Sequence, residues 1–397
     1  MQLKIKDYLI SQKKKQNSKQ LKILKQIYKN HINSKTFFDT FRSNYYYSFK
    51  KLNFGKISRY QNIILIGMGG SALGAKAIYS FLQNKIKKNF YFIDNLKDQK
   101  IISIIKNKTL LRHSFFILVS KSGNTLETLV NYSIFKKYIN KNNTIVITES
   151  ADNELNKLAK KINLPIIEHK RYIGGRYSVL SEVGMLPAKL MNLNIKKFKI
   201  DLIQNLNRNF LIFGKSIIEI SRLVKQPNNY KNLIMICYDD RLLGFLEWLQ
   251  QLVAESLGKE NKGILPVISA CPKDHHSLAQ LYLDGPKDKI FYIFDIKESF
   301  LQHKVANIFG PKFKFLANKT YSKILDAQKR AMMQSLVDKK IPFRTFELLK
   351  IDEKSIGNMF ALFMCEVFML GKLMGINPLN QPAVEAIKTN TKNFLTR

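Results

Sequence analysis

The sequence predicts an α/β fold with doubly wound, mostly parallel sheets flanked by helices. Between residues 61 and 200, short continuous apolar runs alternate with segments whose apolar residues recur at helical spacing. Such alternation is typical of parallel sheets in which a helix follows each strand. The expected order is strand 62–66, helix 71–82, strand 90–93, helix 98–106, strand 115–119, helix 126–139, strand 144–148 and helix 152–161.

The second half of the chain repeats this pattern less clearly. We expect strands at 232–237 and 290–296 and helices at 241–257, 328–337 and 355–374, whereas 299–325 has no clear pattern. Near the N-terminus an apolar stripe predicts a helix packed against the first sheet. The expected organisation is an N-terminal helical segment 1–60, a first domain 61–200 and a second domain 201–397. The stripe consists of Leu21, Ile23, Leu24, Ile27 and Tyr28.

A hydroxyl-rich loop follows the predicted strand 115–119. It reads Ser-Lys-Ser-Gly-Asn-Thr-Leu-Glu-Thr and leads into a predicted helix, so free N–H groups and the positive end of the helix dipole would face an anion. A capped helix start without a ligand is the alternative, since the same residue types occur there. The candidate phosphate-binding residues are Ser120, Lys121, Ser122, Thr125 and Thr128.

A glycine-rich turn, residues 67–74, follows the predicted strand 62–66. Its glycines would let backbone amides approach a ligand closely. The turn also matches a loose Gly-x-Gly-x-x-Ala dinucleotide fingerprint, with Asp94 placed where a ribose-binding acid would be expected. A dehydrogenase is therefore an alternative, although the serine–lysine loop has no role in that fingerprint.

Length and composition fit a protein of two domains with sizeable cores. The chain has 397 residues, of which 45% are hydrophobic. Its three cysteines, Cys237, Cys271 and Cys365, are too far apart to suggest a disulfide framework or a zinc site. The lysine-rich start lacks the apolar core of a signal peptide, and the nearest candidate for a membrane span, 359–371, is short and contains Glu366. We expect a cytoplasmic protein without membrane contact.

The formal net charge of +37 raises the question of nucleic-acid binding. The lysines are scattered among Asn and Ile, without an arginine-rich stripe, a recognition-helix pattern or a base-stacking motif. A codon-composition bias explains this excess more simply. We therefore expect no nucleic-acid partner, although a basic surface would still attract a small anionic substrate.

Four residues are candidates for acid–base chemistry. Glu255 ends the predicted helix 241–257, where the dipole disfavours its charge, as suits a general base; an exposed glutamate is the alternative. His276 is suited to move a proton near neutral pH, although a surface His-His pair is as consistent with the residues. Arg176 follows two glycines and would stabilise oxyanion charge. Lys388, taken alone, is an ordinary helix lysine.

Six segments, in their order along the chain, resemble motifs of the glucose-6-phosphate isomerase family. They extend from about residue 60 to the C-terminus. The resemblance implies two sugar-isomerase (SIS) domains and usually a homodimer with the site at the subunit junction. The segments are loop 67–74, loop 120–128, Gly174-Gly175-Arg176-Tyr177-Ser178, Glu255-Ser256-x-Gly258-Lys259, His276-Ser277-x-x-Gln280-Leu281 and Asn377-Pro378-x-x-Gln381-Pro382-x-Val384-Glu385.

The resemblance also implies roles for these residues. Glu255 would move a proton between C2 and C1 of glucose 6-phosphate or fructose 6-phosphate, and Arg176 would stabilise the cis-enediolate. His276 from the other subunit and Lys388 would assist ring opening. Such chemistry needs a base, an acid and an oxyanion stabiliser, but no redox cofactor and no metal. Gly70 and Ser71 would lie beside the phosphate-binding residues, and the implied substrate contacts beyond the two loops are Gln251 and Gln381.

The sequence departs from the family pattern in places. The chain is shorter than the animal-type members, so it resembles a shortened bacterial-type form, and phosphate contacts by Thr125 are better supported than those by Ser122. His275 stands where many relatives have glutamine, so the ring-opening imidazole is either His276 or His275. Two other functions stay open: a bifunctional isomerase that also accepts mannose 6-phosphate, and a regulator that binds a sugar phosphate without turnover.

Overall fold

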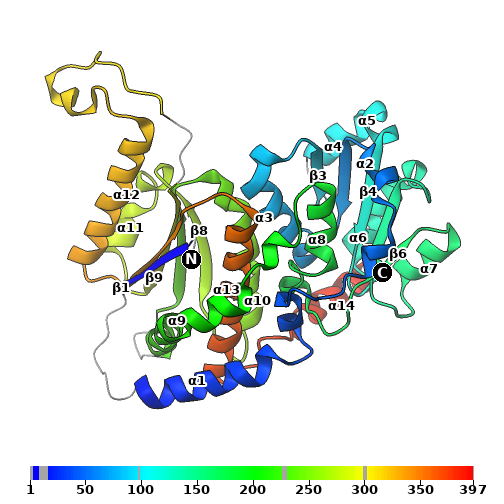
Figure 1. Ribbon diagram of the computed structural model, residues 1–397, viewed down its shortest axis with the longest axis horizontal. Coiled ribbons are helices and arrows are strands. Elements are labelled where there is room, and N and C mark those ends of the chain that lie inside the picture. Colours follow the sequence, from blue (N-terminus) through cyan, green and yellow to red (C-terminus); the bar gives the residue numbers. More distant parts are fainter. Residues whose placement is uncertain (1–2, 9–16, 97–98, 226–229, 298–301, 397) are drawn as a thin grey trace.

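Two five-stranded sheets form the framework of the protein (Figure 1). The computed structural model describes residues 3–8, 17–96, 99–225, 230–297 and 302–396. Both sheets are parallel except for one edge strand, and helices flank them. The predicted α/β fold class is confirmed.

The first sheet has the strand order β3-β2-β4-β5-β6, and all its neighbouring strands are parallel. Chain order reverses between β2 and β4, so their carboxyl ends form the switch point at which ligands of such sheets bind. The glycine-rich turn and the hydroxyl-rich loop both lie there. The strands are β2 (Asn62–Ile66), β3 (Asn89–Ile93), β4 (Ser114–Val119), β5 (Thr144–Thr148) and β6 (Ile166–Glu168).

The helices of the first half largely follow the predicted ranges. The predicted helix 126–139 changes to a 3₁₀ turn, η5 (Lys136–Tyr138), after α6, and residue 98 of the predicted helix 98–106 lies outside the described residues. The helices are α2 (Phe54–Ser58), α3 (Leu73–Leu82), α4 (Gln99–Lys106), α5 (Lys108–Arg112), α6 (Leu126–Phe135), α7 (Glu154–Lys161) and α8 (Glu182–Leu190).

The second sheet has the order β1-β10-β9-β7-β8, with β1 antiparallel to β10 and the other pairs parallel. The predicted strands 232–237 and 290–296 are confirmed as β7 and β9, whereas the other three strands were not predicted. The strands are β1 (Leu3–Tyr8), β7 (Asn232–Cys237), β8 (Leu265–Ala270), β9 (Lys289–Ile296) and β10 (Phe343–Leu348).

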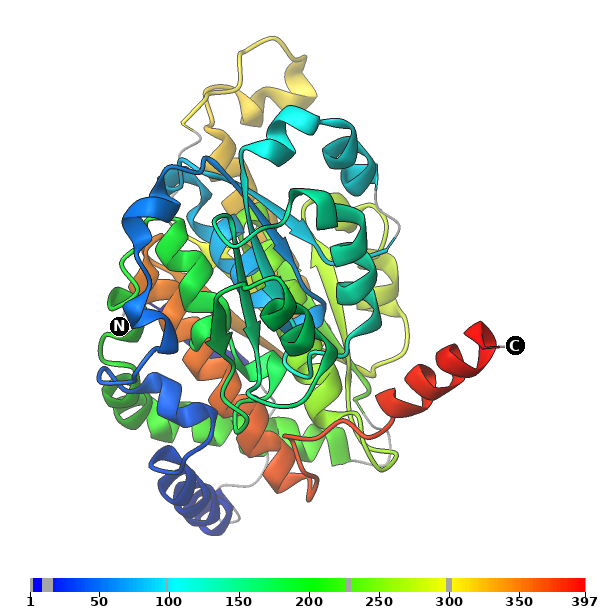
Figure 2. The same cartoon turned by 90° about the vertical axis from the view of Figure 1, so that its right-hand side faces the viewer.

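Long helices pack on the second sheet. Helix α13 is apolar and long enough to cross a membrane, but 89% of its most apolar 18-residue window is buried inside the fold. Helix α14 projects away from the body (Figure 2). The helices are α9 (Leu202–Lys225), α10 (Leu243–Leu257), α11 (Ala279–Asp284), α12 (Tyr321–Asp338), α13 (Glu353–Leu373) and α14 (Val384–Leu395).

The N-terminal segment differs from the expectation that it packs on the first sheet. Its first residues form β1 of the second sheet, and α1 (Asn17–Ile32) lies along α9 and α13. The apolar stripe explains this packing, because Tyr28 contacts the ring of Phe210 on α9 and donates to Asn207 there at 2.8 Å. The later part of the segment reaches the first half, where Tyr45 donates to Glu182 of α8 at 2.9 Å.

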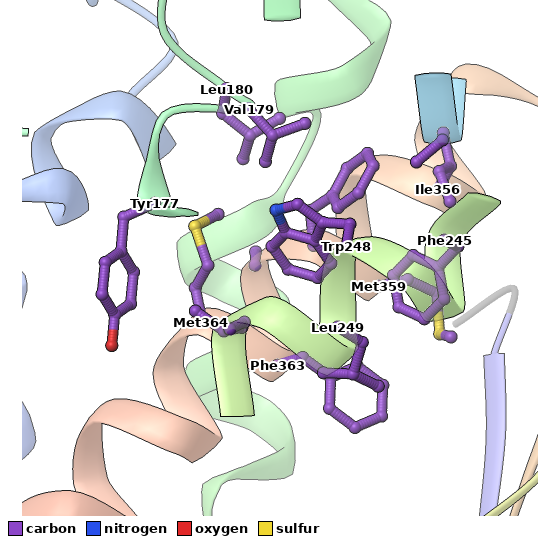
Figure 3. Packing of buried hydrophobic residues seen from close by; sticks show 14 of the residues in the cluster. Tyr177, Val179, Leu180, Phe245, Trp248, Leu249, Ile356, Met359, Phe363 and Met364 are labelled. Atoms are coloured by element: carbon purple, nitrogen blue, oxygen red, sulfur yellow. The ribbon is translucent and has the colours of Figure 1, made fainter. Parts of the chain in front are cut away.

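Helix α10 connects the two halves through the core. It packs on α3 on one side and on α13 on the other. Its Trp248 and Phe245 lie against apolar side chains of α13, and Val179 lies beside Trp248 (Figure 3). Trp248 is edge-on to the ring of Phe360 at 4.8 Å. This packing fixes the C-terminal turn of α10 next to the loops of the first sheet, where the candidate site lies.

Candidate active site

The last turn of α10 presents Glu255 at the edge of the core. Its side chain is 30% exposed, so it is accessible without being fully solvated. Gln251, one turn earlier, donates from Nε2 to Glu255 Oε1 at 2.9 Å. The helix ends at Gly258, whose N–H donates to Ala254 O at 2.9 Å, as predicted from the glycine.

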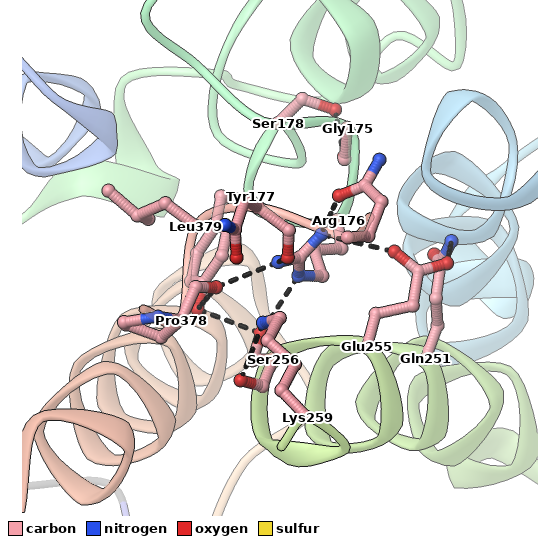
Figure 4. A network of polar contacts seen from close by, with 12 residues as sticks. Gly175, Arg176, Tyr177, Ser178, Gln251, Glu255, Ser256, Lys259, Pro378 and Leu379 are labelled. Carbon is pink, nitrogen blue, oxygen red and sulfur yellow. Dashed lines mark hydrogen bonds and ion pairs between the residues drawn. The ribbon is translucent and has the colours of Figure 1, made fainter. Parts of the chain in front are cut away.

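A buried arginine faces this carboxylate. Arg176 lies in the 3₁₀ turn η6 (Gly175–Tyr177), and its side chain is only 1% exposed. Its Nη1 lies 3.1 Å from Glu255 Oε2, and its Nε donates to Ser256 Oγ at 2.8 Å (Figure 4). The indole of Trp248 donates to the backbone oxygen of Arg176 at 3.1 Å, which holds the turn against α10.

The segment before α14 completes the arginine's contacts. Arg176 Nη2 donates to Pro378 O at 2.7 Å and to Asn380 O at 3.1 Å, and Nη1 also donates to Gln381 Oε1. Tyr177 donates to Pro378 O at 3.3 Å as well. One guanidinium therefore joins three segments that are far apart in the sequence.

The glycine-rich turn packs directly on the arginine turn. A Cβ on Gly70 would lie 2.3 Å from the carbonyl carbon of Gly175, so only glycine permits this approach. Gly69 has φ +51°, and a Cβ there would lie 2.6 Å from Gln251 Nε2. The predicted Ser71 ends the 3₁₀ turn η3 (Gly69–Ser71). The first-sheet loop, the arginine turn and α10 thus meet at one place.

The hydroxyl-rich loop is held by its own hydrogen bonds. Ser120 Oγ accepts from Gly123 N at 3.1 Å and shares a hydrogen bond of 2.9 Å with Thr125 Oγ1. Ser122 Oγ accepts from Asn124 N at 3.3 Å and is exposed. The loop therefore places Ser120, Ser122 and Thr125 at the start of α6, beside the glycine-rich turn.

Two of the predicted phosphate-binding residues, Lys121 and Thr128, have surroundings that differ from those of Ser120, Ser122 and Thr125. Lys121 Nζ lies 3.3 Å from a Glu149 oxygen and donates to Arg171 O at 2.9 Å, so its charge is already partly balanced. Thr128 is fully buried in α6, and its hydroxyl has no hydrogen-bond partner among the described residues.

The two predicted ring-opening residues lie apart from this cluster. In the described part of the chain, no hydrogen bond or ion pair joins His276 or Lys388 to Arg176 or Glu255. His276 is exposed after the 3₁₀ turn η9 (Lys273–His275). Lys388 is exposed on α14 and pairs with Glu385 at 2.7 Å.

The neighbouring histidine is engaged in the fold. His275 Nε2 lies 2.8 Å from the hydroxyl of Tyr238. Burial, followed by the neighbouring His276, lowers the pKa of His275. These contacts leave His276 as the freer imidazole of the pair.

A cavity of about 610 Å³ opens beside Glu255. On its wall Lys76 Nζ lies 2.8 Å from Glu247 and 3.7 Å from Asp94. Asp94, which the dehydrogenase alternative would assign to a ribose, is therefore paired with a lysine. The cavity is also lined by Leu73, Asn95, Gln250, Gln251 and Ala254.

Sequence reasoning assigned no role to several residues of the cluster. Ser256 receives a hydrogen bond at Oγ from Arg176, and Lys259 Nζ donates to Ser256 O at 2.8 Å. Trp248 and Tyr177 orient the same turn. The available signal was that Ser256, Lys259 and Tyr177 are in the same short motifs as the predicted residues.

Two mostly parallel sheets, with a switch-point loop packed beside a glutamate–arginine pair, are the arrangement that the matched class, the phosphosugar isomerases, has to explain. The model of the phosphoglucose isomerase family matches residues 12–396, and the chain belongs to this family. The resemblance inferred from the six motifs is confirmed, and it replaces the dehydrogenase alternative.

Individual proteins support this assignment. The chain is 35% identical to the glucose-6-phosphate isomerase of Methanocaldococcus jannaschii over 352 residues, which cover 84% of each chain. A hypothetical protein from Thermus thermophilus has the same fold, with a TM-score of 0.84, 22% identity and full coverage of both chains. A glucose-6-phosphate isomerase from Chlamydia trachomatis aligns with a TM-score of 0.69 and 20% identity over 86% of this chain and 71% of its own.

Proposed function

We propose that this protein interconverts glucose 6-phosphate and fructose 6-phosphate. Membership of the phosphoglucose isomerase family supports the activity, and the pairing of Glu255 with Arg176 at 3.1 Å is the observation in the fold that carries it. A base next to a fixed cation is what proton transfer through an enediolate requires. The reaction needs neither a redox cofactor nor a metal.

The contacts around Arg176 and Glu255 suggest a catalytic role for each residue. Glu255 takes the proton from C2 and returns it to C1, while Arg176 stabilises the negative charge on the enediolate oxygen. Gln251 and Gln381, which contact these two residues, orient the sugar. The phosphate binds at the switch point, where it meets Gly70, Ser71, Ser120, Ser122 and Thr125.

We also assign the outer phosphate contacts and the residues of ring opening. Lys121 supplies charge to the phosphate from the rim, and Thr128 shapes the loop from beneath it. His276 and Lys388 open the sugar ring. Because both are exposed and lie apart from Arg176, His276 is proposed to act in the site of a partner subunit.

Exposed apolar side chains support a homodimer. Ile308, Phe309, Phe313 and Phe315 are 46–77% exposed on the segment before α12, and Ile387, Phe394 and Leu395 are 68–73% exposed on α14. Surfaces of this kind are usually covered by a partner, and most such assemblies are symmetric dimers. We place the dimer in the cytoplasm, with an N-terminal segment 1–60 and domains 61–200 and 201–397.

The test is conversion of fructose 6-phosphate by the purified protein, followed through NADP⁺ reduction by added glucose-6-phosphate dehydrogenase. Turnover is expected. Binding of fructose 6-phosphate without turnover would contradict the proposal and favour the regulator. A second assay starts from mannose 6-phosphate and measures the formation of fructose 6-phosphate. The bifunctional enzyme would form this product, and the narrow enzyme would not.

A further inference from the structure

A lysine with no role in the proposed reaction so far lies in the turn after α10. Lys259 follows Gly258, and its Nζ donates to Ser256 O at 2.8 Å. This oxygen belongs to the last turn of the helix, whose carbonyl groups have no partners farther along the helix. The ammonium group therefore lies at the negative end of the helix dipole, beside the turn that contains Glu255.

Lys259 and Arg176 bind the same residue from two sides. Ser256 accepts from Lys259 at its backbone oxygen and from Arg176 Nε at its hydroxyl, at 2.8 Å in both cases. Figure 4 shows the two cationic side chains on either side of Ser256, with Glu255 on the adjacent face of the helix. The geometry thus places two cations at the turn that contains Glu255, and Arg176 contacts the carboxylate directly.

The charge of Lys259 responds to these neighbours. Burial, followed by repulsion from Arg176, lowers the pKa of Lys259 to about 8, whereas attraction to Glu255 and Glu260 opposes the shift. The group is half-buried, so its field at Glu255 is screened less than that of an exposed lysine. Its amine is protonated below about pH 8 and loses its charge above that value.

We propose that Lys259 is a second positioning cation of the active site, which acts with Arg176 to hold negative charge as it passes between Glu255 and the sugar. This inference rests on the proposed isomerase function. It names a residue that neither the base nor the oxyanion role includes.

The proton transfer explains why a second fixed cation helps. When the C2–H bond breaks, its proton forms an O–H bond with Glu255, and its electron pair forms the C1–C2 double bond. The negative charge then lies on the former carbonyl oxygen of the sugar, while the carboxyl group is neutral. Fixed cations at the end of α10 stabilise the charge that develops on the sugar oxygen as Glu255 becomes neutral, and they need no reorganisation.

Lys262 provides a matched control. It lies in the same turn, its side chain is 45% exposed, and its nearest acidic partner is Glu260 at 3.5 Å. Lys262→Met removes the same charge from the same loop without touching Ser256. Lys259→Arg keeps the charge and shifts its titration out of the measured range.

The experiment measures kcat and KM for fructose 6-phosphate from about pH 6 to about pH 10, because kcat/KM follows ionisations of the free enzyme. Wild type and Lys262→Met are expected to lose kcat/KM as the pH rises through about 8, as Lys259 is deprotonated. Lys259→Met should lower kcat about tenfold near neutral pH, with little change in KM, and should lack this alkaline step. Lys259→Arg should restore kcat and extend activity to higher pH.

Thermal unfolding of each variant separates a structural role from this one. If Lys259→Met only lowers the melting temperature and keeps the wild-type pH profile, Lys259 is merely a helix cap and the proposal is overturned. An alkaline step that persists in Lys259→Arg also overturns it. If neither the wild type nor Lys262→Met turns over fructose 6-phosphate, the proposed isomerase function itself is contradicted.

Discussion

Arg176 Nη1 and Glu255 Oε2 lie 3.1 Å apart, although 79 residues separate them in the sequence. The pair brings together the turn η6 and the end of α10, and the contact of Gly70 with Gly175 adds the first-sheet loop. A base held by a fixed cation keeps its orientation without substrate. The geometry is therefore preorganised for proton transfer.

Glu255→Gln is expected to abolish isomerisation while fructose 6-phosphate still binds. The amide keeps the size of the side chain but cannot take a proton, so kcat should fall by about 10²- to 10⁴-fold. The coupled dehydrogenase assay measures the loss, and calorimetric titration measures the retained binding. Glu247→Gln, on the same helix and paired with Lys76, is the control. Near-normal turnover of Glu255→Gln would remove Glu255 from the base role.

Co-expression of two inactive variants tests the placement of His276. If His276 acts in the partner's site, a hybrid of Glu255→Gln and His276→Asn chains contains one site with no defect. Random pairing should then restore about a quarter of the wild-type activity. Glu255→Gln mixed with Arg176→Lys should recover nothing, since both residues belong to one chain's cluster. A first mixture no more active than its separate components would place His276 in its own chain's site.

Gly70→Ala should disturb the arginine turn. The added Cβ would lie 2.3 Å from the carbonyl carbon of Gly175 and 2.6 Å from Arg176 N, so the turn must move. We expect a lower melting temperature and kcat/KM reduced at least about tenfold, because small displacements of an oriented group are costly. Gly175→Ala is the matched control, since its Cβ would meet no atom within 4 Å. Equal behaviour of the two variants would argue against this role of Gly70.

Lys121→Ala should raise KM for fructose 6-phosphate about tenfold or more with a smaller effect on kcat, since a hydrogen bond to a charged group contributes about 1.5–3 kcal/mol. Because Lys121 already contacts Glu149 and Arg171, the expected increase in KM lies near the tenfold end of this range. Steady-state kinetics measure it, with Lys161→Ala on the exposed end of α7 as the control. An unchanged KM would count against Lys121 as a phosphate contact.

Arg344→Met should destabilise the second half strongly. Arg344 is fully buried and holds Glu366 of α13 at 2.8 Å and Asp7 of β1 at 2.7 Å, so its loss leaves two carboxylates without their cation. A free energy of unfolding lower by about 3–5 kcal/mol is expected in urea denaturation. The control Arg330→Met removes an exposed ion pair with Asp326. It should change the free energy of unfolding by less than about 0.5 kcal/mol. Similar changes in the free energy of unfolding for the two variants would show that the buried ion pairs of Arg344 contribute little to stability.

Sequence patterns were sufficient to locate strands whose residues are almost all buried. The strands 62–66 and 144–148 agree with β2 and β5 residue for residue, because continuous apolar runs between turns leave few alternatives. The two edge strands of the second sheet were missed for a physical reason. Pro266 interrupts the pattern of β8, and lysines alternate with apolar residues in β1, as edge strands permit.

Sequence patterns predicted part of the candidate site but not its contacts. Short motifs identify Arg176 and Glu255, whereas their pairing depends on how α10 packs between the two halves. No local pattern indicates that His275 contacts Tyr238 and leaves His276 free. Such contacts arise from tertiary packing and require the fold.

Strand β1 pairs with a strand that is synthesised much later, β10. Leu3 of β1 pairs opposite Leu348 of β10, so the outer edge of the second sheet closes only when both ends of the chain are present. At typical rates of translation, roughly 20 to 70 s separate the synthesis of these strands. During that interval β1 has no ladder to join, and contacts of such long range form slowly. A ribosome-bound chain therefore cannot complete the second sheet before β10 has been synthesised.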